Sequence, residues 1–315
     1  MNKFIDLATR IPVGPETPAV SYNPVTLRTA DRPLPLELRL TVAAGDERLP
    51  VILLSHGGGE SRYLASKDGY SPLADFYAAH GFAVIQPTHL SSKIGGLGLD
   101  PSAPGHSMFW RSRIDDMTLI LDRLGDIEEQ ARIAGRLDSD RIAVMGHSAG
   151  GQTAGLLMGA SLRGEPSMLA PRIKAGVLLA PVGNGDGLLP AVLERYPELD
   201  LDFSSLTTRT LVVCGDQDSS PDLTSRGPAW HADPYTRGAG ADALLTLTGG
   251  KHFLGGIMGY DLKETDDEDP ERLAITQRMT WAYLYSALGG DATAWQAATR
   301  ALSEHCAALA TVTSK

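Results

Sequence analysis

One serine in the sequence has the surroundings typical of a catalytic nucleophile. Ser148 is the centre of residues 146–150, which have the pattern G-x-S-x-G. The five residues before the pattern, 141–145, predict a buried strand, and the small residues after it predict the start of a helix. A tight turn between a strand and a helix projects the hydroxyl above a sheet, and the flanking glycines leave room for the backbone to pass. These features predict that Ser148 is a nucleophile.

A serine hydroxyl becomes a good nucleophile only beside a neutral histidine, which in turn needs a carboxylate to fix its tautomer. His252 follows a predicted strand and a Gly-Gly turn, and it is the expected base. His231 is the alternative base, although no strand directly precedes it. Asp218 lies in the loop after a strand that ends at Cys214, and it is the expected acid. Asp216 is the alternative acid, but its place beside the turn glycine suits the closing of a turn.

A glycine-rich loop could stabilise the negative charge that acyl transfer builds on a carbonyl oxygen. Residues 55–59, Ser-His-Gly-Gly-Gly, follow the apolar run 51–54. Two backbone N–H groups aimed at that oxygen contribute several kcal/mol. We expect one from Ala149, directly after the nucleophile, and the other from Gly58, with Gly59 as second choice. A phosphate-binding loop is the rival interpretation, but the Gly-x-x-x-x-Gly-Lys-Ser/Thr pattern is absent from the sequence.

These groups must come from loops at the same edge of a sheet, and the chain alternates between apolar runs and helical patterns as such a sheet requires. The predicted strands are 25–30, 36–43, 51–54, 82–87, 141–145, 173–181, 208–214 and 241–247. The predicted helices are 70–80, 111–133, 149–162, 270–288 with Asp269 as N-cap, and 292–310. The pattern predicts one α/β domain over residues 1–315, with a mostly parallel sheet, helices on both faces and a Pro-rich arm at 1–24.

The bulk composition restricts the classes of partner and compartment. The 315 residues carry a net charge of −10 with no basic run, which argues against a nucleic-acid or anionic-membrane surface. We expect no secretory signal and no membrane span, because no apolar stretch has the required length. Cys214 and Cys306 are the only cysteines, and we expect two unpaired thiols. Together these features predict a cytoplasmic enzyme. The histidines and cysteines lack metal-ligand spacing, so we expect neither metal nor cofactor.

Two loops rich in Gly, Ser and Pro, 88–109 and 182–206, are predicted to cover the site. The larger apolar side chains of the first loop, with Trp110 directly after it and Trp230 farther along the chain, are candidates for substrate binding: Leu90, Met108, Phe109, Trp110 and Trp230. The alternative is that these side chains anchor the loops to the body of the protein. Arg113 and Asp116 are expected to form a surface or helix-end ion pair, and His89 is expected in a loop or at the surface. The acidic segment 263–271 is expected to be a solvated loop.

Four motifs in order give the sequence a resemblance to a known family. HGGG, GHSAGG, GDQD and GGKHF each follow a predicted strand between residues 50 and 255. This combination resembles the α/β-hydrolase fold, in which the triad follows the order Ser, Asp, His. Residues from PVILLSHGGG to RLDSDRIAVMGHSAGG further resemble the dienelactone hydrolase-like and platelet-activating-factor acetylhydrolase-like esterases. Dienelactone hydrolases use a cysteine nucleophile where this chain has Ser148, and the phospholipase-like members often carry a longer residue where it has Gly58.

The motifs and the resemblance together predict a serine esterase that acts on a small-molecule ester through Ser148, His252 and Asp218. A lactonase, an amidase or an acyltransferase could use the same residues. A dehalogenase or epoxide hydrolase is disfavoured, because those enzymes need a carboxylate at position 148. A non-catalytic binding protein of the same fold is the alternative from another class.

Overall fold

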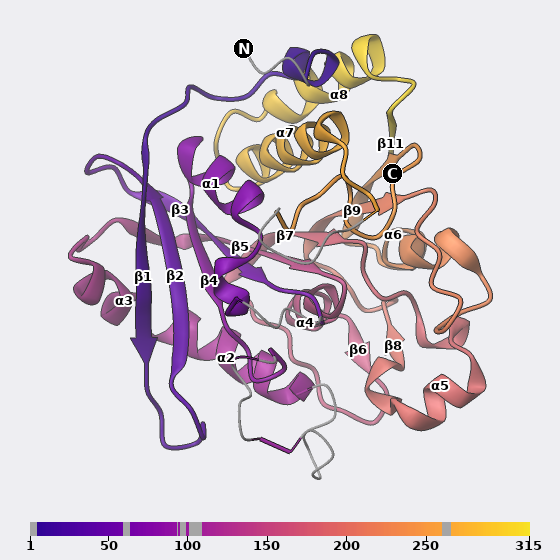
Figure 1. The fold of residues 1–315 in the computed structure, drawn as a ribbon, viewed down its shortest axis with the longest axis horizontal. Coiled ribbons are helices and arrows are strands. Elements are labelled where there is room, and N and C mark those ends of the chain that lie inside the picture. The colour runs from indigo at the N-terminus through magenta and orange to yellow at the C-terminus, as the bar shows by residue number, and fades with distance from the viewer. Residues whose placement is uncertain (1–4, 59–63, 93, 95–98, 101–108, 260–265) are drawn as a thin grey trace.

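A nine-stranded sheet runs through the protein in the computed structural model, which describes residues 5–58, 64–92, 94, 99–100, 109–259 and 266–315 (Figure 1). Its strand order is β1-β2-β4-β3-β5-β7-β9-β10-β11, and the strands from β4 to β10 in this order are parallel. The remaining strands, at the two edges, pair in antiparallel fashion. The strands of the large sheet are β1 (Ala19–Leu27), β2 (Leu36–Ala43), β3 (Leu49–Ser55), β4 (Ala83–Pro87), β5 (Leu137–His147), β7 (Ile173–Leu179), β9 (Arg209–Gly215), β10 (Ala241–Leu247) and β11 (Ala310–Ser314).

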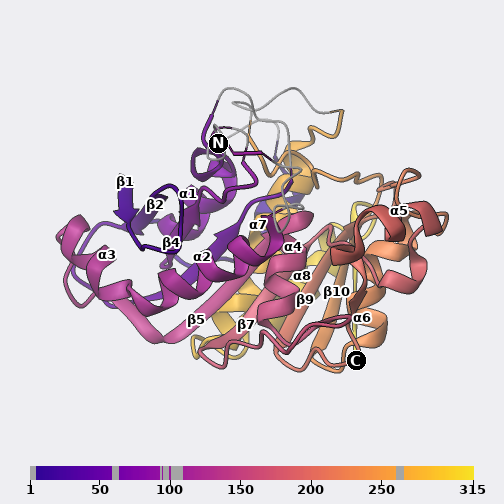
Figure 2. The ribbon, with the colours of Figure 1, turned by 90° about the horizontal axis from the view of Figure 1, so that it is seen from below.

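Helices cover both faces of this sheet, as buried parallel strands require. The helices are α1 (Ser71–Ala79), α2 (Trp110–Asp122), α3 (Leu124–Ala131), α4 (Ala149–Leu157), α5 (Pro190–Arg195), α6 (Asp233–Arg237), α7 (Pro270–Ala287) and α8 (Ala294–His305). One apolar core packs α2, α3 and α4 against the sheet, and the other packs α1, α7 and α8 against its opposite face. Figure 2 shows the first group in front of the strands and α7 and α8 behind them.

The parallel strands end level with one another, and this brings the four predicted motifs to one edge. Ser55 at the end of β3 pairs with Gly146 of β5, and His147 at the end of β5 pairs with Leu179 of β7. Leu247, the last residue of β10, pairs with Gly215, the last residue of β9. The loops that follow β3, β5, β9 and β10 therefore open on the same side of the sheet.

Several element predictions need correction. The predicted arm 1–24 is partly structured, because Ala8 and Ile11 are buried in the core and β1 begins at Ala19. The predicted helix 111–133 is two helices, α2 and α3, which meet at Arg123. The segment 182–206 is not a plain loop, since it contains α5 and the strand β8 (Leu201–Asp202), which pairs with β6 (Ser161–Leu162).

The last predicted helix stops at His305, and the chain then adds the edge strand β11 beside β10. The N-cap prediction is confirmed, because the Asp269 carboxylate accepts hydrogen bonds from the N–H groups of Glu271 and Arg272. Cys214 and Cys306 are both free and buried. Within the described residues, no helix has the length and apolar character needed to cross a membrane.

Candidate active site

Ser148 occupies a strained turn between β5 and α4. Its backbone has φ 53° and ψ −116°, outside the regions that non-glycine residues ordinarily adopt. The neighbouring glycines have no room for a side chain. A Cβ on Gly146 would lie 1.9 Å from the Gly150 carbonyl oxygen, and a Cβ on Gly150 would lie 2.1 Å from the Ser55 carbonyl oxygen. The glycines of G-x-S-x-G are thus required by backbone packing, and the turn has the geometry of a nucleophile elbow.

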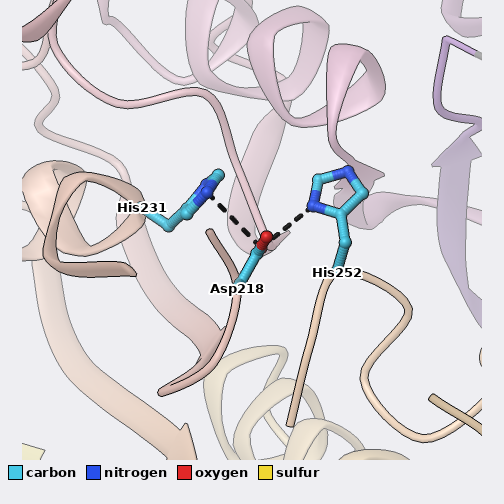
Figure 3. A group of neighbouring side chains, drawn as sticks. All are labelled: Asp218, His231 and His252. Atoms are coloured by element: carbon cyan, nitrogen blue, oxygen red, sulfur yellow. Dashed lines mark hydrogen bonds and ion pairs between the residues drawn. The ribbon is translucent and has the colours of Figure 1, made fainter. Parts of the chain in front are cut away.

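Asp218 and His252 meet beside this turn. The Nδ1 atom of His252 lies 2.9 Å from Oδ2 of Asp218, and the two side chains approach each other from different loops (Figure 3). The Asp218 side chain is 2% exposed and the His252 side chain 32% exposed. Burial acts to raise the pKa of Asp218, but the hydrogen bond from His252 and the nearby imidazoles more than offset it, and the pKa lies below its usual value. Asp218 is therefore a carboxylate that orients His252.

Asp216, the alternative acid, has a different partner. Its Oδ1 atom accepts a hydrogen bond of 2.7 Å from the N–H of Gly249. This bond ties the loop after β9 to the turn that precedes His252. Asp216 therefore closes a turn, as its place beside Gly215 suggested, whereas Asp218 is the carboxylate that lies at hydrogen-bond distance from His252 Nδ1.

His231, the alternative base, lies on the other side of Asp218 (Figure 3). Its Nε2 atom is 3.5 Å from Oδ2 of Asp218, and its side chain is 2% exposed. Nδ1 donates to the carbonyl oxygen of Pro181 at 2.6 Å, so a neutral ring leaves Nε2 as an acceptor, and Ser220 Oγ lies 3.2 Å away. Burial lowers the pKa of His231. The ring is enclosed beneath the acid, whereas His252 is the partly exposed imidazole.

Asp218, His231 and His252 also form the one group of metal-ligand type found in the described parts of the chain. One ligand atom from each residue lies within 4.8 Å of the others. A divalent cation at this point would need Nδ1 of His252 to be unprotonated, because that atom would become the ligand. The same Nδ1 is the one that faces the Asp218 carboxylate at hydrogen-bond distance. The arrangement suits a catalytic acid–base pair, and holding a metal would require the opposite tautomer.

A third histidine connects the nucleophile turn to the base. His147 directly precedes Ser148, and its Nε2 donates to the backbone carbonyl of His252 at 2.8 Å. Its Nδ1 therefore accepts from the hydroxyl of Tyr70 at 2.7 Å, and that hydroxyl accepts from the N–H of Gly57 at 3.0 Å. Burial, followed by the charge of His252, lowers the pKa of His147 to about 3. His147, which is neutral at neutral pH, thus joins the glycine loop, the Ser148 turn and the loop that carries His252.

Gly58 and Ala149 lie together, as the oxyanion-hole prediction requires. A Cβ built on Gly58 would be 3.4 Å from the Ala149 Cβ. Ala149 begins α4, where backbone N–H groups lack helical partners. The N–H of Gly57 is already bonded to Tyr70, so it does not compete for this role. Gly59, the second choice, lies outside the described residues.

The predicted substrate-binding side chains are more enclosed than expected. Leu90 is 5% exposed and Phe109 is 7% exposed. Trp110 is half-buried against the core and lies beneath the Arg111 guanidinium. Trp230 is 0% exposed, and its indole N–H donates to the Asn184 carbonyl. Trp230 thus anchors a loop to the body of the protein. Met108 lies outside the described residues.

Some important residues were missed or misplaced from sequence. Arg113 and Asp116 are both 2% exposed, so a surface position is wrong for them. His89 lies in the loop after β4, as one of its two predicted locations allowed, but it is 0% exposed. Asp267, in the segment expected to be solvated, is 4% exposed and accepts from the Lys251 N–H at 3.1 and 3.0 Å. Tyr70 gave no sequence signal, because its role depends on a contact 77 residues away in the chain. The i, i+3 spacing of Arg113 and Asp116 places both on one face of an amphipathic helix, which is the one signal that could have indicated their burial.

The hydroxyl of Ser148 makes no hydrogen bond within the described part of the chain. The preceding residue, His147, lies next to His252, since the ring centroids of these two histidines are 4.9 Å apart. Catalytic hydrogen bonds are often long without substrate and tighten in the complex, so this geometry is compatible with a nucleophile and its base.

Comparison with known proteins identifies the group to which these motifs belong. The model of a family described as the alpha/beta hydrolase family matches residues 51–312. Cutinase 1 of Thermobifida cellulosilytica is 28% identical over 62% of this chain and 59% of its own length. The cutinase of Thermobifida fusca (strain YX) is 28% identical over 62% of this chain and 51% of its own length.

A third relative, the bis(hydroxyethyl) terephthalate hydrolase of Streptomyces coelicolor (strain ATCC BAA-471 / A3(2) / M145), is 29% identical over 58% of this chain and 54% of its own length. The chain thus spans between 51% and 59% of the length of these curated relatives. The α/β-hydrolase prediction is confirmed. The resemblance to the dienelactone hydrolase-like and platelet-activating-factor acetylhydrolase-like group stays a prediction.

Proposed function

Because the chain belongs to the alpha/beta hydrolase family, we propose that it hydrolyses carboxylic esters through an acyl-enzyme formed on Ser148. The observation that carries this proposal is the 2.9 Å contact between His252 Nδ1 and Asp218 Oδ2 beside the strained elbow. When the Nδ1–H of His252 donates to the Asp218 carboxylate, Nε2 carries no proton and can accept one. The named activities of the relatives support an ester substrate, since bis(hydroxyethyl) terephthalate is itself an ester.

The chemistry divides into two steps. In the first, Ser148 Oγ attacks the ester carbonyl, its proton passes to His252, and the alcohol leaves with that proton. In the second, water gives a proton to His252 and attacks the acyl-enzyme, and the acid is released as Oγ regains the proton. The N–H groups of Gly58 and Ala149 would bind the oxyanion in both steps. Asp218 stays ionised throughout and stabilises the imidazolium form of His252.

Of the candidates within the described residues, Leu90, Phe109 and Trp110 are proposed to border the acyl pocket. The small-molecule ester that fits this pocket is proposed to be one with an apolar acyl group, in keeping with these side chains. The cytoplasmic location inferred from the sequence likewise stays a prediction.

A fluorophosphonate probe and a series of p-nitrophenyl esters test the proposed function. We expect the probe to label Ser148 in the folded protein and the esters to be hydrolysed with a burst of p-nitrophenol, with both signals absent in Ser148→Ala. The acyl chain length that gives the highest kcat/KM then measures the pocket. Folded wild-type protein that neither reacts with the probe nor turns over any ester would instead support a non-catalytic binding protein.

A further inference from the structure

A buried arginine lies beneath the glycine loop that follows β3. Arg113 projects from α2 and is 2% exposed. Its guanidinium donates to the His56 carbonyl at 2.7 Å and to the Gly57 carbonyl at 3.1 Å, and its Nε donates to Ser91 Oγ at 2.9 Å. Burial lowers the pKa of Arg113 to about 10, which leaves it a cation at neutral pH. The planar guanidinium group of Arg113 therefore holds two consecutive peptide carbonyls of the loop.

This contact determines the direction of the next N–H group. In a planar trans peptide, the C=O of one residue and the N–H of the following residue point in opposite directions. Because the Gly57 carbonyl points at Arg113, the Gly58 N–H points away from it. Gly58 is also the loop glycine that packs against Ala149, and its N–H has no acceptor within the described residues. Arg113 thus turns the peptide so that the Gly58 N–H lies on the side opposite the guanidinium.

A second set of hydrogen bonds supports the base of the same loop. Ser55 Oγ lies 3.0 Å from His89 Nε2, and His89 Nδ1 lies 2.9 Å from Asp116 Oδ2. Burial, followed by the charges of Arg113 and Arg32, lowers the pKa of His89, so the ring is neutral and donates to the carboxylate. The connectivity is Ser-His-Asp, but the three side chains are 0%, 0% and 2% exposed. No substrate reaches a relay this deeply buried, so it acts as a support for the loop.

The loop is held by still another imidazole. His56 Nδ1 donates to the Gly57 carbonyl at 2.7 Å, and His56 Nε2 accepts from the backbone N–H of His89 at 3.1 Å. The Gly57 carbonyl therefore receives donors from both His56 and Arg113. Glycine is the most flexible residue, and a run of glycines would otherwise leave this peptide free to rotate.

We propose that Arg113 is a positioning residue for the oxyanion hole, which acts by fixing the peptide between Gly57 and Gly58. The inference rests on the proposed function. Arg113 does not touch substrate; its effect on the reaction passes through the Gly58 N–H. Loss of Arg113 should therefore weaken the stabilisation of the oxyanion and leave binding of the ground-state ester nearly unchanged.

The test compares Arg113→Met with wild type on matched p-nitrophenyl esters and thionoesters. The sulfur of a thionoester is a poor hydrogen-bond acceptor, so a working oxyanion hole favours the ester. We expect kcat to fall about 100-fold in Arg113→Met with little change in KM, as for loss of one oxyanion donor. We also expect the ester-to-thionoester ratio of kcat/KM to fall about tenfold or more, a change that a lower fraction of folded enzyme cannot produce.

Arg136→Met is the matched control. Arg136 is also a buried arginine, 8% exposed, and it donates to the carbonyls of Ala43 and Glu47, away from the glycine loop. Its loss should lower stability and leave the ester-to-thionoester ratio at the wild-type value. Where Arg113→Met fails to fold, Arg113→Lys serves instead, since a lysine can hold one carbonyl but not both, and its ratio should be intermediate.

A wild-type ester-to-thionoester ratio in the Arg113 variants, with wild-type kcat per labelled Ser148, would overturn this inference while leaving the esterase proposal intact. Absence of both labelling and turnover in the wild-type protein would overturn the proposed function itself. The two failures are thus separate.

Discussion

His252 Nδ1 and Asp218 Oδ2 lie 2.9 Å apart, although the residues come from loops after two different strands. The parallel pairing of β9 and β10 makes this possible, since Gly215 and Leu247 end the two strands at the same level. Each loop then needs only a few residues to return over the sheet edge. The pairing of strands thus sets the distance between the base and its acid.

The first prediction separates the two aspartates. Asp218→Asn should lower kcat by about 10⁴, because the amide cannot fix the tautomer of His252. Asp216→Asn is the matched control, because its amide oxygen can still accept from the Gly249 N–H. Steady-state kinetics on a p-nitrophenyl ester measures both. A greater loss of kcat in Asp216→Asn than in Asp218→Asn would show that Asp216, and not Asp218, is the acid.

The second prediction concerns the glycines of the elbow. Gly146→Ala should destabilise the protein by about 3 kcal/mol or more, since its Cβ would meet backbone atoms that cannot move away. Urea unfolding gives the free energy. Gly125→Ala in α3, where a Cβ would have no atom within 4 Å, is the control and should stabilise by up to about 1 kcal/mol. Equal stabilities for the two variants would contradict the packing argument.

The third prediction concerns pH. In the folded protein His147 stays neutral until the pH approaches its pKa of about 3, whereas in the unfolded chain it takes up the proton near pH 6.5. The unfolded state then binds more protons between these values, so the free energy of unfolding decreases as pH falls below 6.5. The His147 contribution approaches about 1.4 kcal/mol per pH unit.

His147→Gln should therefore show a shallower loss of stability between pH 6 and pH 4 than wild type, measured by urea unfolding across that range. Parallel curves for the wild type and the His147 variant would show that this ring takes up its proton equally in both states.

The fourth prediction concerns the support of the base loop. Both carboxylate oxygens of Asp267 accept from the Lys251 N–H, directly before His252. Asp267→Asn would turn an amide donor toward that N–H, and we expect kcat to fall about tenfold or more because His252 shifts. Asp266→Asn is the neighbouring control, since the Asp266 carboxylate pairs with the ammonium of Lys251, whose side chain is 44% exposed, and not with the Lys251 backbone. Equal activity in the two variants would exclude a positioning role for Asp267.

The local pattern of apolar residues was sufficient to predict the parallel strands of the sheet. Apolar runs such as 51–54 and 211–214 predicted buried strands because a strand covered on both faces has no polar side. The strands at the edges of the sheet were harder to predict. β11 was missed, because the last predicted helix ended at residue 310 and the pairing of β11 with β10 depends on a partner more than 60 residues away. The break at Arg123 between α2 and α3 lies two residues before Gly125, but a single glycine within an apolar helical pattern did not separate the two helices in the sequence prediction.

The sequence by itself determined the elbow, the glycine loop and the order of Ser148, Asp218 and His252, because these depend on short-range sterics and on which loop follows which strand. Only the tertiary structure decided which polar residues are buried. Arg113 and His89 lie on segments that alone would be solvated, and their burial follows from the packing of α2 beneath the glycine loop. The elbow is thus a local property of the chain, whereas the support of its oxyanion loop exists only once distant segments have come together.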